Sequence, residues 1–600
     1  MQEFAVPARR VPPAEAMMAD DVFTNAEDWP DHVAFNRKVD GQWKPVTSKQ
    51  FADEVIALAA GLMAAGIRTG DRVAIMAPTS YEWMMCDFAI WVAGAVTVPV
   101  YETSSTSQVE WILGDSGAVA AFAATADHAA TIGKVQGALP SLREVWTFEE
   151  HGIDKLVAGG QTVTREEVEA RRHEVNSDSL ATIVYTSGTT GRPKGCAITH
   201  GNLANNVQNV CEADGVREHV FNETKSTLLF LPLAHILARQ IQLAAVRTHV
   251  RLGHTADIKH VADELVAFQP TSVLSVPRVF EKVYNTAKHK AMAEGHEAIF
   301  ARAESTAIAY SMAMDRGGPG LWLRFKHAIF DRLVYGKLRA AMGGKVEYAV
   351  SGGAPLGTRL GHFFRGMGIT ILEGYGLTET CSGVHLNLPG AQKVGTVGRP
   401  FPGHAVRISP EGEVLLKGPS NFRGYWNNEA ATREVFDDEG WFHTGDIGEL
   451  DDDGYLSITG RIKDLIVTSG GKNVAPAVLE DGLRAHWLVS QCVVVGDGRP
   501  FITALITLDP DAVAEWLTEK GRQPADPATL KEDPELLAEV QLAVDDANSA
   551  VSQAEAIKRF RILANDFSEV GGELTPTLKV KRANVLKEFA DEVEALYAHQ

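Results

Sequence analysis

The chain has 600 residues, of which 45% are hydrophobic and 22% are charged, and these ordinary globular values exclude an intrinsically disordered or collagen-like protein. Acidic residues outnumber basic ones and the net charge is −20; without a block of Lys and Arg, we expect no nucleic acid partner. Small anionic ligands stay compatible with this charge, because local dipoles and a bound cation outweigh it at a site.

The N-terminal part of the chain predicts neither a targeting signal nor a membrane span. Residues 1–21 lack the apolar region of a secretory signal. The longest apolar stretch, residues 84–100, is interrupted by Asp87, Gly94 and Pro99, whereas a span needs ~20 apolar residues. We interpret this stretch as a buried helix followed by a strand, in a soluble protein for which peripheral contact with a membrane stays open.

The cysteines predict a reducing environment. They form no Cys-x-x-Cys pair, so we expect neither a disulfide framework nor a zinc site, and the predicted location is the cytoplasm. The five cysteines are Cys86, Cys196, Cys211, Cys381 and Cys492.

Helical and strand patterns alternate through the first three quarters of the chain. A helical stripe of apolar residues covers 51–65, and residues 72–76 then have the pattern of a strand. The same order recurs later, with a helix over 258–268 and a strand over 271–276. This alternation predicts βαβ units and largely parallel sheets.

The pattern changes in two later parts of the chain. Residues 285–340 are predicted to be helical, with a break at the Gly-Gly-Pro-Gly of 317–320. Beyond residue 400, two hairpins are predicted, one around the turn 451–454 and one around 496–500. The predicted fold class is therefore α/β, with a large N-terminal domain of βαβ-rich sheets over 1–462 and a small, mobile α+β domain over 463–600.

The most informative segment is Tyr-Thr-Ser-Gly-Thr-Thr-Gly-Arg-Pro-Lys-Gly, residues 185–195. We expect a loop here, between a strand over 181–185 and a helix that begins near Thr199. Successive backbone N–H groups, hydroxyls and Lys194 form the donor set of a phosphate cradle; a solvated Ser/Thr/Gly loop is the alternative. The segment is not a Walker A motif, because Arg192 and Pro193 separate Gly191 from the lysine, so a P-loop kinase or ATPase is disfavoured.

Two further strands run into glycine-rich segments. One strand over 346–350 leads into Ser-Gly-Gly-Ala-Pro, and another over 369–372 leads into Glu-Gly-Tyr-Gly-Leu-Thr-Glu. Ligands of α/β sheets bind at the carboxyl ends of the strands. Tyr375 is suited to stack on a base, Thr378 to donate to a phosphate and Glu379 to hold Mg²⁺, although each segment by itself also fits a simple turn.

Taken together and in this order, the motifs resemble those of adenylate-forming enzymes, the superfamily of acyl-CoA synthetases, peptide-synthetase adenylation domains and luciferases. The resemblance extends over roughly residues 30–590, and its motifs are 185–195, 374–379, Thr-Gly-Asp at 444–446 and Gly-Arg-Ile-Lys-Asp at 460–464.

Within that superfamily the chain is most similar to long-chain fatty acid CoA ligases. The finer resemblance rests on the predicted helical insertion near 285–340 and on four short segments. These are Leu-Pro-Leu-Ala-His at 231–235, Pro-Arg-Val-Phe-Glu-Lys at 277–282, Ser-Gly-Gly-Ala-Pro-Leu at 351–356 and Leu-Thr-Pro-Thr-Leu-Lys at 574–579.

The resemblance implies that ATP and Mg²⁺ activate a long-chain fatty acid to an acyl-adenylate, which CoA then converts into a thioester. Carboxylate and ATP are both anions, so catalysis must supply positioning and positive charge. The implied Mg²⁺ residues are Thr186 and Glu379. The implied phosphate residues are Thr186, Ser187, Gly188, Thr189, Thr190 and Lys194. The implied adenosine residues are Gly352, Gly353, Ala354, Glu373, Gly374, Tyr375, Asp446 and Arg461. Gly376 and Thr378 belong to the same implied nucleotide site.

Two residues with implied catalytic roles are ambiguous by themselves. Lys579 matches the family's adenylation lysine, which bridges the carboxylate and the α-phosphate, but it also fits a surface lysine in a basic patch. The segment lacks the glycine that precedes this lysine in many relatives. His235 fits either the entrance for the acyl chain or a core histidine.

Lys463 occupies the implied hinge about which the small domain rotates between the two half-reactions, and an exposed linker lysine is the alternative. A further lysine that some relatives carry after the hinge is replaced by Val467. Arg239 stands where certain long-chain relatives have an aromatic gate, so the acyl tunnel is not assigned to residues.

Two other functions stay open at this point. One is a fatty acyl-AMP ligase that passes the acyl group to a carrier protein instead of CoA. The other is a nucleotide-binding regulator without catalysis, against which the presence of both Glu379 and Lys579 speaks. The predicted partners are the small molecules fatty acid, ATP and CoA.

Overall fold

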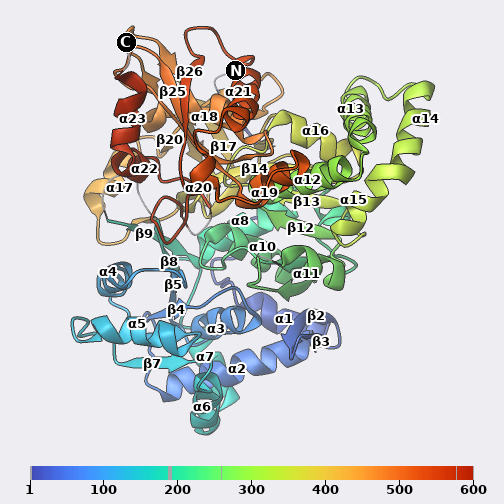
Figure 1. Ribbon diagram of the computed structural model, residues 1–600. Helices are drawn as coiled ribbons and strands as arrows, with labels where there is room; N and C mark the ends of the chain where they lie inside the picture. Colours follow the sequence, from blue (N-terminus) through green and yellow to red (C-terminus); the bar gives the residue numbers. More distant parts are fainter. Residues whose placement is uncertain (1–2, 187–191, 259, 576–577, 599–600) are drawn as a thin grey trace.

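The computed structural model describes residues 3–186, 192–258, 260–575 and 578–598 (Figure 1). Two large sheets form the N-terminal part, and each combines parallel strands with at least one antiparallel edge. The predicted alternation of helices and strands is confirmed, as is the α/β class with a large N-terminal and a smaller C-terminal domain.

One large sheet has nine strands in the order β16-β15-β14-β13-β12-β10-β11-β2-β3. Strands β14, β13, β12, β10, β11 and β2 run parallel, while β15, β16 and β3 pair antiparallel at the edges. The strands are β2 (Val33–Val39), β3 (Gln42–Thr47), β10 (Ser226–Leu229), β11 (Arg251–His254), β12 (Ser272–Ser275), β13 (Tyr348–Ser351), β14 (Thr370–Leu377), β15 (Ser382–Leu386) and β16 (Arg399–Pro400).

The other large sheet has seven strands in the order β19-β9-β8-β5-β4-β6-β7. Strands β8, β5, β4, β6 and β7 are parallel, and β9 and β19 extend the sheet antiparallel. The strands are β4 (Arg72–Met76), β5 (Val96–Val100), β6 (Ala120–Ala123), β7 (Glu144–Thr147), β8 (Leu180–Thr186), β9 (Lys194–Thr199) and β19 (Gly424–Tyr425).

A layer of helices joins the two large sheets. Apolar side chains of α3, α8 and α10 belong to one core cluster with strands of both sheets, and α4 and α5 cover the other face of the seven-stranded sheet. The helices of this part are α1 (Asp20–Asp28), α2 (Ser48–Ala64), α3 (Tyr81–Val92), α4 (Thr106–Ser116), α5 (Ala126–Gln136), α6 (Gly152–Gly159), α7 (Arg165–Arg172), α8 (His200–Cys211), α9 (Val216–His219), α10 (Ile236–Thr248), α11 (Val261–Phe268) and α16 (Thr358–Gly366), with a 3-10 turn at Gly160–Thr162.

Local sequence signals explain where these helices begin. The Thr199 hydroxyl accepts from the backbone of Asn202, whose side chain in turn accepts from the backbone of Thr199, so a capping box starts α8. Pro277 occupies the first turn of α12 (Pro277–Ala293), where its missing N–H costs nothing. The capping box at Thr199 confirms the helix start that was expected near this residue.

The predicted helical insertion is confirmed, with its break at the glycines before α14. It consists of α12 (Pro277–Ala293), α13 (Glu297–Met314), α14 (Leu321–Phe330), a π-helical turn (Asp331–Tyr335) and α15 (Gly336–Ala341). Within the described part of the chain, no helix combines the length and apolar character needed to cross a membrane.

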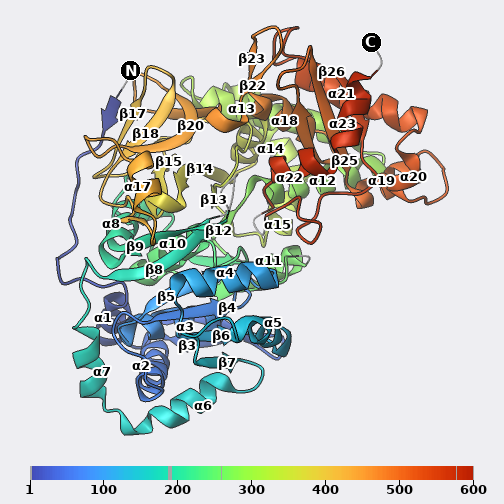
Figure 2. The same cartoon turned by 90° about the vertical axis from the view of Figure 1, so that its left-hand side faces the viewer.

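A third sheet and the C-terminal sheet lie at the same end of the molecule (Figures 1 and 2). The five-stranded sheet has the order β1-β17-β18-β20-β21 and contains the first predicted hairpin, formed by β20 and β21. Its elements and those around it are β1 (Glu3–Ala5), β17 (Ala405–Ile408), β18 (Glu413–Lys417), α17 (Glu429–Val435), β20 (Phe442–Leu450), β21 (Leu456–Arg461) and the 3-10 turns Thr378–Thr380 and Ile462–Asp464.

The C-terminal sheet has the order β24-β25-β26, and β24 and β25 form the second predicted hairpin. One of its faces packs on α18, α19 and α21 and the other on α22 and α23. The elements are β22 (Ile466–Val467), β23 (Asn473–Val474), α18 (Pro476–Arg484), β24 (Val489–Val495), β25 (Ile502–Leu508), α19 (Pro510–Glu519), α20 (Pro527–Leu530), α21 (Pro534–Asn548), β26 (Ile557–Ile562), α22 (Arg582–Glu588) and α23 (Ala590–Tyr597).

Two sequence-based expectations were wrong in detail. The segment before Thr199 is not loop but strand β9, which pairs antiparallel with β8, because its buried residues 195–199 complete the sheet. Residues 373–377 are likewise not a loop: β14 continues to Leu377 and pairs with β15, with a bulge between Tyr375 and Gly376.

Candidate active site

Both ends of the predicted phosphate segment belong to paired strands of the seven-stranded sheet. Thr186 ends β8 and pairs with Lys194, the first residue of β9. The Lys194 ammonium lies 4.9 Å from the ring centre of Tyr425 on the neighbouring strand β19. Ser187, Gly188, Thr189 and Thr190 fall outside the described residues.

Glu379 lies close to these paired strands, on the 3-10 turn that follows β14. Its carboxylate accepts a hydrogen bond of 2.8 Å from the Tyr425 hydroxyl. Burial raises the pKa of the nearby Cys196 thiol, and the charge of Glu379 raises it further. A hydrogen bond with the Thr186 side chain acts in the opposite direction. The two residues predicted to hold Mg²⁺ therefore both lie near the buried side chain of Cys196, and Thr378 is next to Glu379 on the same turn.

The donor set in this place fits a magnesium ion. Among the described residues no group of three or more His, Cys, Asp and Glu side chains gathers as in an all-protein metal cage. Mg²⁺ keeps several waters and commonly needs one or two protein oxygens beside the phosphates of its nucleotide. The Glu379 carboxylate and the Thr186 hydroxyl supply hard oxygens of that kind.

Asp446 joins two other predicted residues. It lies on β20 opposite Arg461 of β21, and its buried carboxylate accepts from Arg461 Nε at 2.7 Å and from the Tyr375 hydroxyl at 2.6 Å. Burial and the charge of Asp446 raise the pKa of Tyr375, so this phenol stays a donor. The preceding Gly445 has φ +70°, a conformation that favours glycine.

The two glycine-rich segments contact each other. The carboxylate of Glu373 accepts the backbone N–H of Leu356 at 3.0 Å, which ties β14 to the loop that contains Gly352, Gly353 and Ala354. Burial raises the pKa of Glu373 to about 7, against the effect of the Leu356 hydrogen bond. A Cβ on Gly352 would lie 3.7 Å from the carbonyl oxygen of Gly374.

Close packing of the backbone explains why residue 376 is a glycine. A Cβ on this residue would lie 1.9 Å from the carbonyl oxygen of Ser382, far inside any permitted contact. Gly376 therefore allows β14 and β15 to pair at the bulge, and its place in the nucleotide site stays a prediction.

Lys579 reaches this site from the C-terminal domain. A Cβ on Gly353 would lie 3.8 Å from its ammonium nitrogen, and the backbone N–H of Lys579 donates to the Thr575 hydroxyl at 3.0 Å. Desolvation of the ammonium, followed by repulsion from Arg461, lowers the pKa of Lys579 to about 8, although Asp446 acts in the opposite direction.

His235 is a half-buried neighbour of Lys579. It precedes α10, and its Nδ1 accepts the backbone N–H of Leu237 at 3.2 Å. Burial, with a smaller contribution from the Lys579 charge, lowers the pKa of His235 to about 3. A neutral imidazole therefore lies near the lysine.

Two other predicted positions have different surroundings. Lys463 is exposed on the turn Ile462–Asp464, between the last strand of the five-stranded sheet and the C-terminal domain. Arg239 is fully buried, and its guanidinium donates to both carboxylate oxygens of Asp87, the shorter distance being 2.7 Å, and to Thr182. Arg239, which stands where certain relatives have an aromatic gate, therefore forms a buried ion pair with Asp87.

Sequence reasoning missed Tyr425, Ser275 and Ser351 as neighbours of the site. Ser275 and Ser351 end the adjacent parallel strands β12 and β13 in register, and their buried hydroxyls have no hydrogen-bond partner among the described residues. A polar residue that ends a buried strand is the signal that points to such positions, whereas Tyr425 carries no comparable signal.

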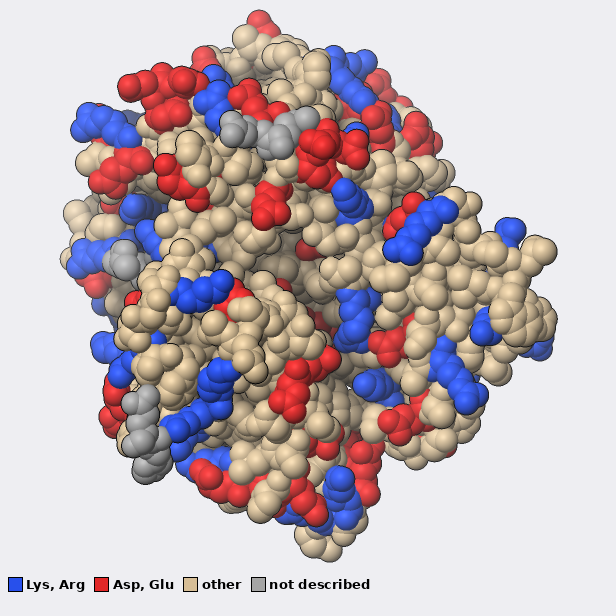
Figure 3. Space-filling model, turned by 90° about the horizontal axis from the view of Figure 1, so that it is seen from above, with Lys and Arg blue, Asp and Glu red and all other residues tan. Residues whose placement is uncertain are grey.

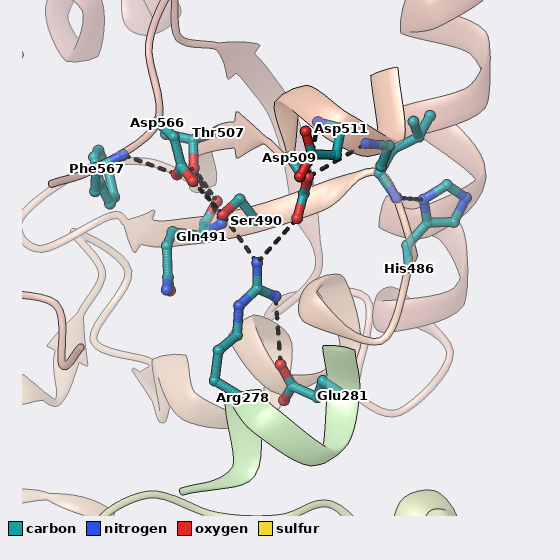
Figure 4. A network of polar contacts seen from close by, with 12 residues as sticks. Arg278, Glu281, His486, Ser490, Gln491, Thr507, Asp509, Asp511, Asp566 and Phe567 are labelled. Carbon is teal, nitrogen blue, oxygen red and sulfur yellow. Dashed lines mark hydrogen bonds and ion pairs between the residues drawn. The ribbon is translucent and has the colours of Figure 1, made fainter. Parts of the chain in front are cut away.

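Polar contacts hold the C-terminal domain against the N-terminal part (Figure 4). Arg278 of α12 donates to the Ser490 hydroxyl at 3.0 Å and lies 3.8 Å from Asp509. Thr507 in turn donates to Asp566 at 2.6 Å. In this arrangement of the domains, Lys579 is beside Gly353.

Comparison with known proteins shows the family of the chain. The family model of the AMP-binding enzymes matches residues 22–426, and the model of their C-terminal domain matches 463–600. The chain belongs to the family of AMP-binding enzymes.

Individual relatives cover the chain from end to end. It is 52% identical over 601 residues to the long-chain-fatty-acid–CoA ligase FadD15 of Mycobacterium tuberculosis, with 100% of both chains covered. It is 30% identical to the human long-chain-fatty-acid–CoA ligase ACSBG1, over 95% of this chain and 84% of that protein. The fold is similar to the A-PCP didomain of the carboxylic acid reductase of Segniliparus rugosus in complex with AMP, with a TM-score of 0.75, 22% identity, and 99% and 84% of the two chains covered.

Proposed function

We propose that the protein is a long-chain fatty acid CoA ligase. It activates the acid with ATP to an acyl-adenylate and pyrophosphate, and then transfers the acyl group to CoA with release of AMP. The observation that carries the proposal is the place of Lys579, which comes from the C-terminal domain and lies beside Gly353, Asp446 and Arg461. The full-length similarity to long-chain-fatty-acid–CoA ligases supports the substrate class.

The nucleotide is held by groups from several strands. Asp446 accepts from the ribose hydroxyls, because its carboxylate is already fixed by Arg461 and Tyr375. The loop of Gly352, Gly353 and Ala354 and the strand residues Glu373, Gly374 and Tyr375 enclose the adenine. Lys194 and the hydroxyls of residues 186–190 bind the phosphates. Thr186 and Glu379 hold Mg²⁺, which screens the phosphate charge when it is bound.

Lys579 acts in the first half-reaction. The attacking carboxylate and the α-phosphate are both anionic. An ammonium group between them therefore weakens their repulsion and stabilises the negative charge that develops during attack. The neutral His235 lies near this ammonium, and we place it at the entrance of the acyl chain, where it orients the carboxylate without adding a second charge.

The second half-reaction requires the lysine to leave. We propose domains over 1–462 and 463–600, with Lys463 at the hinge between them. The start of the C-terminal family match at residue 463 and the exposure of Lys463 support this boundary. Arg278 contacts the C-terminal domain through polar side chains, and polar contacts are common at interfaces that open and close.

CoA is the proposed acceptor, and transfer to a carrier protein is not favoured by the relatives. For the location we propose the cytoplasm, since the five cysteines are buried and unpaired. Peripheral contact with a membrane is part of the same proposal, because a long-chain fatty acid partitions into bilayers.

The proposal is tested by the exchange of labelled pyrophosphate into ATP in the presence of a series of fatty acids. We expect exchange that depends on the acid, rises with chain length and requires Mg²⁺, and acyl-CoA as the product when CoA is added. Exchange without a fatty acid requirement, or acyl transfer to a phosphopantetheine carrier with CoA inert, would overturn it.

A further inference from the structure

Helix α14 has its apolar side on the outside. None of its ten residues, all within the described range, is buried. Five large apolar side chains on α14 and the turn after it are between 42% and 85% exposed. These side chains, which we call the α14 patch, are Leu321, Trp322, Phe325, Ile329 and Leu333.

The spacing of the patch follows the helix. Positions 321, 325 and 329 are four residues apart and therefore share one face of α14. The rings of Trp322 and Phe325 are stacked at 5.6 Å between their centres, and the Lys326 ammonium lies 5.3 Å from the Trp322 ring centre. The exposed face is thus a continuous apolar surface with aromatic rings in its middle.

The opposite side of the helix is fixed to the protein. His327 stacks on Tyr310 at 3.9 Å between ring centres, and its Nε2 is 2.6 Å from the carbonyl oxygen of Gly366. Phe330 packs against the main hydrophobic core. The patch therefore faces outward because the helix is anchored on its other side, and Figure 1 shows α14 at the margin of the molecule.

Basic residues surround the patch. In residues 316–337 the only acidic side chain of this described segment is Asp331, and Arg339 pairs with it at 2.7 Å. Five basic side chains of the segment are exposed, and none of them forms an ion pair with another described residue; they are Arg316, Arg324, Lys326, Arg332 and Lys337. Figure 3 shows this lobe at the right, mainly tan with blue at its edges.

We propose that the α14 patch docks the protein on a bilayer surface with anionic lipid headgroups. Exposed apolar and aromatic side chains framed by Lys and Arg are the composition of an interfacial helix, and tryptophan prefers the boundary between headgroups and acyl chains. The positive segment stands out against the net charge of −20 of the whole chain, so attraction to an anionic surface is local to this lobe.

A second copy of the chain fits the patch less well. In a symmetric dimer the same surface meets itself, which would bring the five unpaired basic side chains of each copy against those of the other. The inference rests on the proposed function for its biological reason, because the bilayer is where long-chain fatty acids accumulate, but the geometry of the patch is independent of the catalytic site.

The test is cosedimentation of the full-length protein with vesicles, without any substrate. One set of vesicles contains phosphatidylcholine and phosphatidylglycerol in equal parts, and the other contains phosphatidylcholine alone. We expect binding to the anionic vesicles that weakens with salt, and a loss of about tenfold or more in the partition coefficient for the double variant Trp322→Ser/Phe325→Ser. The variant Arg324→Gln/Lys326→Gln should lose most of the preference for phosphatidylglycerol.

Matched controls carry the same kinds of change elsewhere on the surface. Leu542→Ser/Val570→Ser removes exposed apolar side chains, and Arg68→Gln/Lys134→Gln removes the same positive charge from exposed positions; both should bind like the unsubstituted protein. The conservative Trp322→Phe should also bind.

Two results would overturn the inference. One is that the unsubstituted protein does not bind the vesicles, or that the Trp322→Ser/Phe325→Ser variant binds them equally well. The other is a dimer in analytical ultracentrifugation that this variant abolishes. Pyrophosphate exchange with a detergent-dispersed fatty acid is measured on the same samples: its absence in the unsubstituted protein refutes the proposed function, whatever the vesicles show.

Discussion

Lys579 is the residue in which position, charge and proposed chemistry meet. Its ammonium lies beside Gly353 and close to both Arg461 and Asp446, and desolvation is the main reason why its pKa is low. A lysine of this kind can lose its proton, and with it its positive charge, within the pH range in which an enzyme works. The sequence shows Lys579 in a basic segment, but the charges that perturb it come from residues more than a hundred positions away.

The pKa of Lys579 predicts an alkaline limit of adenylation. The charged form is required, and it disappears as the pH rises through the folded-state value of about 8. We therefore expect kcat/KM for adenylate formation to be constant below this pH and to fall about tenfold per unit above it. The measurement is the pH profile of pyrophosphate exchange.

An arginine at this position removes the titration. The guanidinium keeps its proton up to about pH 12. The pH profile of Lys579→Arg should therefore show no fall on the alkaline side, even if its overall rate is lower, whereas the profile of Lys581→Ala should keep that fall. The same fall in the Lys579→Arg variant would show that another group titrates.

Tyr375 and Asp446 give a second prediction at this scale. Tyr375→Phe removes the hydroxyl that donates to the buried carboxylate of Asp446, and a hydrogen bond to a charged group contributes about 1.5–3 kcal/mol. We expect KM for ATP to rise about tenfold with a smaller change in kcat, because Asp446 is then less well positioned for the ribose.

Tyr455→Phe is the matched control for steady-state kinetics. Its hydroxyl donates to the exposed carbonyl of Ala391 at 2.8 Å, and its loss should leave KM unchanged. If both variants behave alike, Asp446 does not depend on Tyr375 for its position.

At the scale of elements, much of the architecture follows from local patterns. The capping residues at Thr199 mark a helix start, and the turn at 451–454 predicts the hairpin of β20 and β21, because each depends on neighbours in sequence. Strand β9 and the extension of β14 could not be predicted in this way. Strand β9 is also paired with β19, which is distant in sequence, and the bulge through which β14 pairs with the next strand, β15, has no local signature.

The candidate site divides along the same line. The phosphate, glycine-loop and Thr-Gly-Asp motifs indicate which residues take part, since their donors are contiguous in sequence. Their mutual contacts are not contiguous: Tyr375 and Asp446 are 71 positions apart. The reason why Arg239 replaces an aromatic residue is also a long-range one, because Asp87 on α3 is its partner.

The ion pair of Arg239 predicts a large effect on stability. Arg239→Ala leaves the Asp87 carboxylate charged and unpaired between α3, α10 and β8, where burial raises the pKa of Asp87 against the attraction of Arg239. We expect a loss of about 3–5 kcal/mol in the free energy of unfolding, measured by urea denaturation of the N-terminal domain.

Two variants separate this pair from an ordinary one. Arg247→Ala breaks a partly exposed contact of 3.8 Å with Asp21 and should cost less than about 1 kcal/mol. Arg239→Leu/Asp87→Leu removes both charges and should recover a large part of the loss. A loss in the double variant as great as in Arg239→Ala would mean that packing, and not the unpaired charge, dominates.

At the scale of the whole molecule, the arrangement of the two domains decides which half-reaction the site performs. The contacts of Arg278 with Ser490 and Asp509 exist in the arrangement that places Lys579 in the site (Figure 4). Arg278→Ala should therefore slow adenylation by up to about tenfold and spare the transfer to CoA. Arg302→Ala, at an exposed position of α13, should affect neither step.

Lys463→Pro should have the opposite signature, because proline stiffens the proposed hinge. Adenylation stays measurable while thioester formation falls sharply. Rapid-quench measurement of the two steps for both variants tests the arrangement, and equal losses in both steps for either variant would contradict it.

The central claim is that a lysine from the C-terminal domain serves one half-reaction at a nucleotide held by the N-terminal domain. Its most direct test is Lys579→Ala, assayed for pyrophosphate exchange with a fatty acid and, separately, for CoA transfer from a preformed acyl-adenylate. We predict a loss of about a hundredfold or more in the exchange and little change in the transfer. Equal losses in both reactions, or exchange that survives the substitution, would contradict the account.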